Sequence, residues 1–291
     1  MIVQEVRIII GKSGKEIFKA GNGESETGGS FQCGSVCEPT SPVPKGEGPG
    51  APASTRQPAI GRNNGDMLPT ILKKVFPFVF SLTVVSVCLF GSAGRLTWPN
   101  AWILLVLNFV AGILAMSVLW RDSELSAERA NTKAGKSWDK PIVFVVVLLG
   151  PMATWITAGL DTRFHWSAGM GWSAVVAGVC AGLLAVLLIA WAMRTNRFFS
   201  AIVRIQKDRG HAVVSSGPYR FVRHPAYTGM AAFTLATPLI LNSRWAFVPA
   251  VATIAFHLLR TALEDRTLQR ELDGYADYAC RVKYRLVPLV W

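Results

Sequence analysis

The sequence predicts an all-α fold, a polytopic membrane helix bundle with four full spans, a short C-terminal helical hairpin and a cytoplasmic amphipathic C-terminal helix. Three observations indicate this class. Of the 291 residues, 51% are hydrophobic and only 16% are charged. The apolar residues gather in runs of about 20, the length that a helix needs to cross a bilayer. The Lys and Arg residues gather in alternate connections between these runs.

Composition divides the chain into three expected parts. Residues 1–66 are rich in Gly, Pro, Ser and Glu, so they cannot bury enough apolar surface to offset the entropy of ordering. We expect them to be a disordered N-terminal extension, with Met67 as the natural start of the protein. Residues 67–193 are expected to form the four-span bundle, and residues 194–291 a cofactor-binding part made of a loop, a hairpin and a helix.

The expected spans follow one another along the chain. The four full spans are residues 75–93, 98–120, 141–160 and about 171–193. Tryptophans stand at both ends of the second, where the bilayer interface favours aromatic side chains. The runs at 226–241 and 246–259 have only about fifteen residues each. They predict a short hairpin, either two tilted crossings or a re-entrant pair.

Residues 260–281 are charged but periodic. Their apolar side chains recur every three or four positions, which places them on one face of a helix. These side chains are Leu268, Leu272, Tyr275 and Ala279, and Val282 continues the same face just after the segment. We therefore expect an amphipathic helix that docks on the membrane part from the cytoplasm.

The distribution of charge predicts the orientation of the chain and excludes one class of partner. The net charge is +12, and residues 67–291 hold 23 of the 30 basic residues but 11 of the 18 acidic ones. Segments 121–140 and 194–224 carry much of this excess, so the positive-inside rule places both segments and both termini in the cytoplasm. Nucleic acid is not an expected partner, because the sequence shows no basic stripe with interleaved aromatic residues. The expected partners are the lipid bilayer and a lipophilic substrate.

The five cysteines predict neither a disulfide framework nor a metal site. Cys33 and Cys37 are close in sequence, but no second pair of ligands lies near them, which makes zinc a weak interpretation. Cys88 and Cys180 lie in apolar runs and are interpreted as small hydrophobic residues.

The polar segment SGPYRFVRHPAYTGM, residues 216–230, lies between apolar runs. Its glycines and prolines predict a fixed loop. His224 precedes Pro225 at the start of a membrane helix, where unpaired N–H groups and the helix dipole favour an anionic ligand group. Arg220 and Arg223 add positive charge. A purely structural role is the alternative for His224.

Glu264 and Asp265 follow the last apolar run. One interpretation is structural, either a solvated helix start or a salt bridge with Arg260 at i, i+4. The other is a pair of carboxylates at a membrane boundary that hold a ligand's amino group or ribose hydroxyls. Together with the cationic segment, the second interpretation suits a cofactor that carries an amino acid.

These residues carry a resemblance to a known family. GPYRFVRHPAYTG, followed about forty residues later by RTALED and a final YRLVPLVW, resembles the isoprenylcysteine carboxyl methyltransferase family, within the wider group that includes phospholipid N-methyltransferases. SELSAER at 123–129, KSWD at 136–139 and NRFFSA at 196–201 also match, so the resemblance covers about residues 68–291. It implies a membrane enzyme that binds S-adenosylmethionine at its cytoplasmic C-terminal part.

The resemblance also implies the site residues. The cofactor would be bound by Gly217, Tyr219, His224, Pro225, Tyr227, Glu264 and Asp265, with Arg223 beside them. This sequence has Glu-Asp where the family commonly has Glu-Glu, which makes Asp265 the less secure assignment. Arg223 and Arg260 would orient the methyl acceptor through paired N–H donors. Glu264 or Tyr227 would accept a proton if the acceptor is an amine.

The implied reaction is in-line transfer of a methyl group from the sulfonium to a lipophilic acceptor. A carboxylate acceptor needs desolvation and alignment but no general base. The acceptor stays open among prenylated cysteine, a phospholipid amine, an isoprenoid acid and a hydrophobic xenobiotic. Three alternatives remain beside an O-methyltransferase: a phospholipid N-methyltransferase, an NADPH-dependent sterol-type reductase with a similar Arg-His-Pro-x-Tyr segment, and a non-enzymatic membrane protein.

Overall fold

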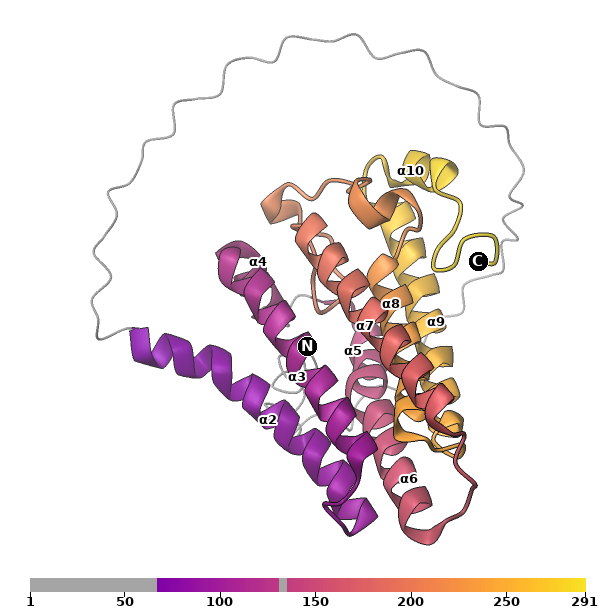
Figure 1. The fold of residues 1–291 in the computed structure, drawn as a ribbon. Coiled ribbons are helices and arrows are strands. Elements are labelled where there is room, and N and C mark those ends of the chain that lie inside the picture. The colour runs from indigo at the N-terminus through magenta and orange to yellow at the C-terminus, as the bar shows by residue number, and fades with distance from the viewer. Residues whose placement is uncertain (1–66, 131–134) are drawn as a thin grey trace, which may run out of the picture. The chain divides into compact units, whose positions relative to one another are not determined.

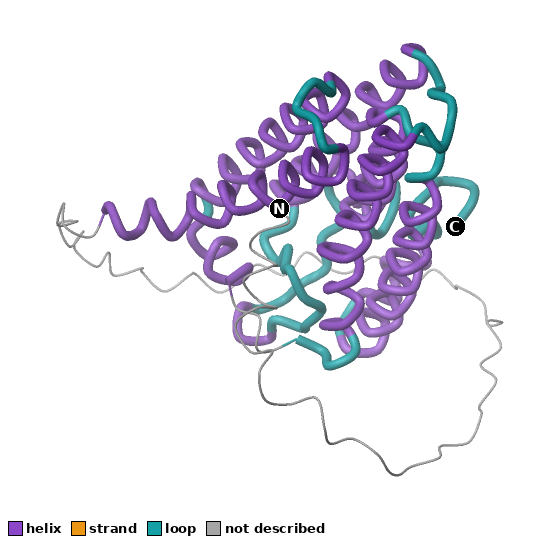
Figure 2. Tube along the Cα trace, turned by 90° about the horizontal axis from the view of Figure 1, so that it is seen from below, coloured by secondary structure: helices purple, strands orange, loops and turns teal. Residues whose placement is uncertain are grey.

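The computed structural model describes residues 67–130 and 135–291, and every regular element within these two ranges is a helix (Figures 1 and 2). Five of these helical stretches are long and apolar enough to cross a membrane: Val75–Ala93, Pro99–Arg121, Asp139–Phe164, Trp172–Thr195 and Phe247–Glu271. The predicted all-α, polytopic class is therefore confirmed, and the chain is an integral, multi-pass membrane protein. The extension expected at residues 1–66 lies outside the described residues. Residues Lys74–Trp291 belong to one compact unit, and all the packing described below lies within it.

Helices α2 (Met67–Ala93) and α3 (Pro99–Arg121) correspond to the first two predicted spans. Gly94, with φ of 67°, ends α2, because a left-handed residue cannot continue a right-handed helix. Pro99 begins α3, where its missing N–H costs no helical hydrogen bond. The short helix α4 (Ser123–Ala130) follows, and the Asp122 carboxylate accepts the Leu125 N–H at 2.8 Å. This hydrogen bond caps the N-terminal end of α4.

The third span is made of three consecutive pieces: α5 (Asp139–Phe144), a π-helical turn η2 (Val145–Leu149) and α6 (Gly150–Phe164). It extends a few residues beyond the predicted range at both ends. Gly150 stands where α6 meets α9, and a Cβ added at this position would collide with the Thr253 side chain. The contact of these two helices thus depends on the absence of a side chain at Gly150.

Helices α7 (Trp172–Thr195) and α8 (Pro225–Leu241) pack antiparallel with closely approaching backbones. A Cβ added to Gly178 would lie 2.8 Å from the Ile240 nitrogen. A Cβ added to Gly229 would lie 2.9 Å from the Ala185 carbonyl oxygen. Glycines therefore set the separation between α7 and the helix that begins at His224 and Pro225.

Helix α9 (Phe247–Glu271) differs from the predicted short second arm of the hairpin. It has 25 residues and continues without a break through Arg260 and Asp265. Charged residues were expected to mark the end of the apolar run, but Arg260 and Asp265 are buried with polar partners, so the helix passes through them. Helix α8, with 17 residues, remains a short apolar helix as predicted.

The predicted amphipathic helix at 260–281 is divided in two. Leu272 has extended backbone angles and Gly274 has φ of 77°, which separates α9 from α10 (Tyr275–Arg281). The predicted apolar face nevertheless holds together, since all five of its side chains belong to one cluster with Ile205, Val213 and Tyr278. The connection between α7 and α8 includes the 3-10 turns η3 (Lys207–Arg209) and η4 (Gly217–Arg220). This connection, α10 and the C-terminal segment gather at one end of α7, α8 and α9 (Figure 1).

Candidate functional site

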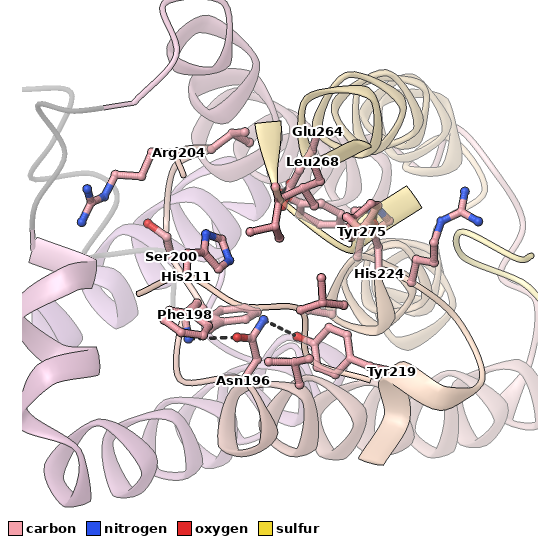
Figure 3. A pocket seen from close by; sticks show the side chains of 18 of the residues that line it. Asn196, Phe198, Ser200, Arg204, His211, Tyr219, His224, Glu264, Leu268 and Tyr275 are labelled. Atoms are coloured by element: carbon pink, nitrogen blue, oxygen red, sulfur yellow. Dashed lines mark hydrogen bonds between the residues drawn. The ribbon is translucent and has the colours of Figure 1, made fainter. Parts of the chain in front are cut away.

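A cavity of about 110 Å³ lies at the end of the helices where α8 begins. Its lining is mixed, and it is called the polar cavity below because charged and hydrogen-bonding side chains face it. Its walls come from the connection before α8, from the first turns of α8, and from the last turns of α9 with α10. Figure 3 shows Glu264 and Leu268 on α9 facing Asn196, Phe198 and Tyr219 across this space. Segments that are distant in sequence are therefore brought to one pocket.

Six of the nine residues that the sequence and the resemblance singled out line this cavity: Tyr219, Arg223, His224, Tyr227, Arg260 and Glu264. Gly217 and Pro225 do not line it, but each is within two positions in the chain of a residue that does. Gly217 has φ of 57° and starts the turn η4 that carries Tyr219. Pro225 is the first residue of α8 and directly follows His224.

Glu264 is held by Tyr227. The Tyr227 hydroxyl donates a hydrogen bond of 2.5 Å to Glu264 Oε2. Both residues line the cavity, and Glu264 remains partly exposed. Because Tyr227 engages only one carboxylate oxygen in this contact, Glu264 is placed to offer negative charge to a ligand.

Asp265 is the centre of a buried ionic cluster rather than part of the cavity lining. Arg223 donates to it at two points, from Nε to Oδ1 at 2.8 Å and from Nη2 to Oδ2 at 2.9 Å. Arg285 Nε donates to Oδ2 at 2.9 Å, and the Tyr275 hydroxyl donates to Oδ1 at 3.1 Å. His224 Nε2 lies 3.2 Å from Oδ1. Both oxygens of Asp265 are thus engaged by the protein, and the carboxylate positions Arg223 and His224.

Arg223 also joins this cluster to the C-terminal segment. Its Nη1 donates to the carbonyl oxygens of Val282 at 2.8 Å and Lys283 at 3.0 Å. The Arg223 and His224 amides donate to the carbonyls of Tyr284 and Arg285, each at 2.9 Å. The loop that precedes α8 and the C-terminal segment therefore form one hydrogen-bonded unit.

Arg260 pairs with Asp139, which is distant in sequence. Its Nε and Nη2 donate to the two Asp139 oxygens at 2.8 and 3.1 Å, and Nη2 donates to the Ala201 carbonyl at 2.8 Å. Asp139 also accepts the Val203 N–H at 2.7 Å. The Arg260 guanidinium carbon lies 5.3 Å from the centre of the Tyr227 ring, a cation–π contact. KSWD, which contributed to the resemblance, thus supplies the partner of a cavity residue.

Several cavity residues were not predicted as site residues. Asn196 donates from Nδ2 to the Tyr219 hydroxyl at 3.3 Å, and its Oδ1 accepts the Phe198 N–H at 2.9 Å (Figure 3). His211 Nδ1 accepts the Gln206 N–H at 3.2 Å. The match at NRFFSA was the signal for Asn196 and Phe198, whereas no local pattern distinguished His211 from other loop residues.

The cavity wall contains titratable groups that burial keeps neutral. Burial lowers the pKa of His211, and the nearby cations Arg204 and Arg209 lower it further. Burial raises the pKa of Tyr219 and of Tyr275, so both stay protonated at neutral pH. The two tyrosines are therefore hydrogen-bond donors in this wall.

A second cavity, of about 130 Å³, lies among the membrane helices. Its lining is mostly apolar and comes from α2, α3, η2, α6, α7, α8 and α9, with side chains such as Phe78, Leu114 and Phe233. Met230 and Arg260 line both this cavity and the polar one. A polar and an apolar compartment therefore adjoin at these two side chains.

Within residues 67–130 and 135–291, no group of three or more His, Cys, Asp or Glu side chains is arranged to hold a metal ion. Cys33 and Cys37 lie outside the described part of the chain. The charged side chains that line the polar cavity are arginines and Glu264.

Comparison with known proteins shows that the segment carrying this site is similar to one sequence family. Residues 177–270 match the family model of the isoprenylcysteine carboxyl methyltransferases. The matched segment contains the polar loop, all of α8, and Arg260, Glu264 and Asp265 on α9.

Individual relatives carry related names. Protein-S-isoprenylcysteine O-methyltransferase B of Arabidopsis thaliana is 26% identical over 119 residues, which are 40% of this chain and 57% of the relative. Protein-S-isoprenylcysteine O-methyltransferase of Mus musculus is 29% identical over 140 residues, 45% of this chain and 47% of the relative. This chain thus spans about half the length of the curated relatives that it matches.

One solved structure, of the eukaryotic intramembrane Ras methyltransferase named isoprenylcysteine carboxyl methyltransferase, aligns with a TM-score of 0.47 and 20% identity, over 78% of this chain and 86% of that one. The polar loop and the Arg260 to Asp265 segment, which carry the resemblance in the sequence, both fall within the family match. The resemblance of this chain to the isoprenylcysteine carboxyl methyltransferase family is therefore confirmed.

Proposed function

We propose that this protein is an integral membrane methyltransferase that transfers a methyl group from S-adenosylmethionine to the carboxylate of a lipophilic substrate, as an isoprenylcysteine O-methyltransferase does. The observation that carries the proposal is the adjoining pair of cavities. A polar compartment suits a soluble cofactor, an apolar one suits a lipid, and Met230 and Arg260 line both.

The polar cavity offers groups that complement each part of the cofactor. Glu264, held by Tyr227, supplies negative charge for the amino group or the sulfonium. Phe198, Phe199 and Tyr219 line the cavity and supply aromatic faces for the adenine ring. In this assignment Glu264 contacts the cofactor, while Asp265 and Arg223 hold His224 and the loop in place.

The acceptor is assigned to the apolar cavity, with its reacting end near Arg260. In the methyl transfer, a carboxylate oxygen forms a bond to the methyl carbon while the carbon–sulfur bond breaks, and the sulfur leaves as a neutral thioether. No proton moves, so this site needs no general base. What the chain supplies is alignment, exclusion of water and a fixed cation at Arg260, whose orientation Asp139 determines.

An amine acceptor is the second candidate. It would lose a proton on methylation, and Glu264 and Tyr227, which could accept that proton, both line the polar cavity. A neutral carboxylic ester as product and a methylated amine as product differ in mass and charge, so the two candidates separate in one assay. For either acceptor, the positive-inside rule supports placing the cavity and both termini on the cytoplasmic side, since segment 194–224 forms one of its walls.

The test uses the full chain reconstituted in lipid nanodiscs. Calorimetric titration is expected to show S-adenosylmethionine binding, and methyl-labelled cofactor is expected to transfer label to an S-farnesylcysteine derivative without NADPH oxidation. Glu264→Gln is expected to weaken cofactor binding at least tenfold. Binding of NADPH in place of S-adenosylmethionine, or no binding of either by the wild-type protein, would overturn the proposal.

A further inference from the structure

His257 is a polar residue in the apolar cavity that the proposed reaction does not use. It lies on α9, three residues before Arg260, so the two side chains share one face of the helix. Both line the apolar cavity. The side chain of His257 is 3% exposed, and its Nδ1 has no hydrogen-bond partner among the described residues.

Two other polar side chains of this cavity, Asn108 and Thr234, differ from His257 because each hydrogen-bonds a carbonyl of its own helix. The Asn108 amide donates to the Leu104 carbonyl at 2.9 Å. The Thr234 hydroxyl donates to the Met230 carbonyl at 2.9 Å. A buried ring nitrogen without a partner costs free energy in a membrane interior, where no bulk water can replace the missing hydrogen bond. His257 is therefore expected to have its partner in a bound molecule.

We infer that His257 hydrogen-bonds the lipophilic acceptor next to its reacting group and makes this site selective for lipids that carry a hydrogen-bonding group at the Arg260 end. The inference rests on the proposed function, and it names the class of substrate more closely. A neutral imidazole can donate from Nδ1 to a carboxylate or accept from a hydroxyl or amine. An apolar chain that lacks such a group leaves Nδ1 unpaired and is discriminated against.

The chain length of the acceptor and its polar end are thus recognised by different parts of the cavity. Side chains such as Phe78 and Leu114 line the part of the cavity assigned to the apolar chain, where the free energy of binding depends on the apolar area that is buried. Hydrogen bonding at His257 depends on the polar group. A change at His257 is therefore expected to alter discrimination between two lipids that share the same apolar chain.

The test compares two labelled probes with one isoprenoid chain, N-acetyl-S-farnesylcysteine and farnesyl methyl thioether, in equilibrium binding to the full chain in nanodiscs. His257→Leu removes the ring nitrogens, whereas His257→Asn keeps an amide near the place of Nδ1. His257→Leu is expected to weaken binding of the carboxylate probe about tenfold and to leave the thioether probe within about twofold. His257→Asn is expected to restore most of the loss.

Catalysis provides a second measurement. His257→Leu is expected to raise KM for the acceptor while the Kd for S-adenosylmethionine stays at the wild-type value, a separation that general loss of folding would not produce. Equal weakening of both probes, no weakening of either, or failure of the wild-type protein to bind the carboxylate probe would overturn the inference. Failure of the wild-type protein to bind S-adenosylmethionine, with probe discrimination intact, would instead count against the proposed function.

Discussion

Arg260 and Asp139 form a buried, two-point ion pair between residues that are 121 positions apart, with Nε–Oδ1 and Nη2–Oδ2 distances of 2.8 and 3.1 Å. The pair joins the start of the third span to the helix that carries Glu264. It also fixes the guanidinium that lies between the two cavities. The position of Arg260 therefore depends on a residue outside both cavity linings.

Asp139→Asn is expected to destabilise the protein by about 3 to 5 kcal/mol, because it removes the buried counter-charge that Asp139 supplies to Arg260. Thermal unfolding in detergent measures this loss. The control is Lys136→Ala, which breaks the partly exposed pair with Glu271 and is expected to cost less than about 1 kcal/mol. Similar losses in the two variants would contradict the role of the buried pair.

The adjacent carboxylates Glu264 and Asp265 are expected to respond differently to neutralisation. Asp265→Asn removes the charge that two arginines share and is expected to lower stability by several kcal/mol. Glu264→Gln is expected to leave the unfolding temperature nearly unchanged while the Kd for S-adenosylmethionine rises. Calorimetry and thermal unfolding on both variants distinguish these effects. A loss of affinity in Asp265→Asn together with a loss of stability in Glu264→Gln would place the ligand contact at Asp265.

Tyr227→Phe removes the hydroxyl that holds Glu264. Loss of one hydrogen bond to a charged group corresponds to about 1.5 to 3 kcal/mol, so the affinity for S-adenosylmethionine is expected to fall by about tenfold or more. Titration of the cofactor against the variant measures this fall. Tyr284→Phe is a matched control outside the cavity lining, and an equal fall in that variant would argue for a general effect.

Stability is expected to fall in mild acid through His211. Its folded-state pKa lies below the ordinary value of 6.5 because burial and two arginines disfavour the charged ring, so the unfolded state takes up the proton first. Stability is thus fully present above about pH 6.5 and decreases as the pH falls below it. His211→Asn keeps an acceptor for the Gln206 N–H and is expected to lose part of this dependence between pH 7.5 and 5.5. Identical pH profiles would exclude His211 as the source.

The close packing of α7 and α8 is expected to tolerate no side chain at Gly229. Gly229→Val would place atoms within 3 Å of the Ala185 carbonyl and is expected to cost several kcal/mol or prevent folding. Gly91→Ala, on α2, has no atom within 4 Å of the added Cβ and is expected to be neutral or slightly stabilising. Expression and unfolding temperature of the two variants provide the comparison.

The sequence was sufficient for the helical class and for most span boundaries, because runs of apolar residues directly reflect the thickness of the bilayer. It was insufficient where burial of charge decided the structure. Arg260 and Asp265 were interpreted as the end of a membrane run, yet their ion pairs allow α9 to continue to Glu271. Local spacing also suggested Glu264 as a partner of Arg260, but no local pattern could reveal Asp139, which lies 121 positions away.

The candidate site was predictable only in part, because some of its residues are brought together by folding and are not close in sequence. Motif residues such as His224 and Tyr227 are close in sequence and were identified together. His211 joins them through the folding of the segment between α7 and α8, and no local pattern distinguishes it from other loop residues. The separate role of Asp265 depends on Arg285, twenty residues away, and becomes visible only in the hydrogen bonds.

The hydrogen bonds from Arg223 to the carbonyls of Val282 and Lys283, and from Arg285 to Asp265, make the buried ionic cluster depend on a segment that follows the last helix of the structure. Removal of residues 282–291 would leave every membrane helix in the chain but would take partners away from Arg223 and Asp265. A protein truncated before Val282 is therefore expected to insert in the membrane and to bind S-adenosylmethionine more weakly than the full chain.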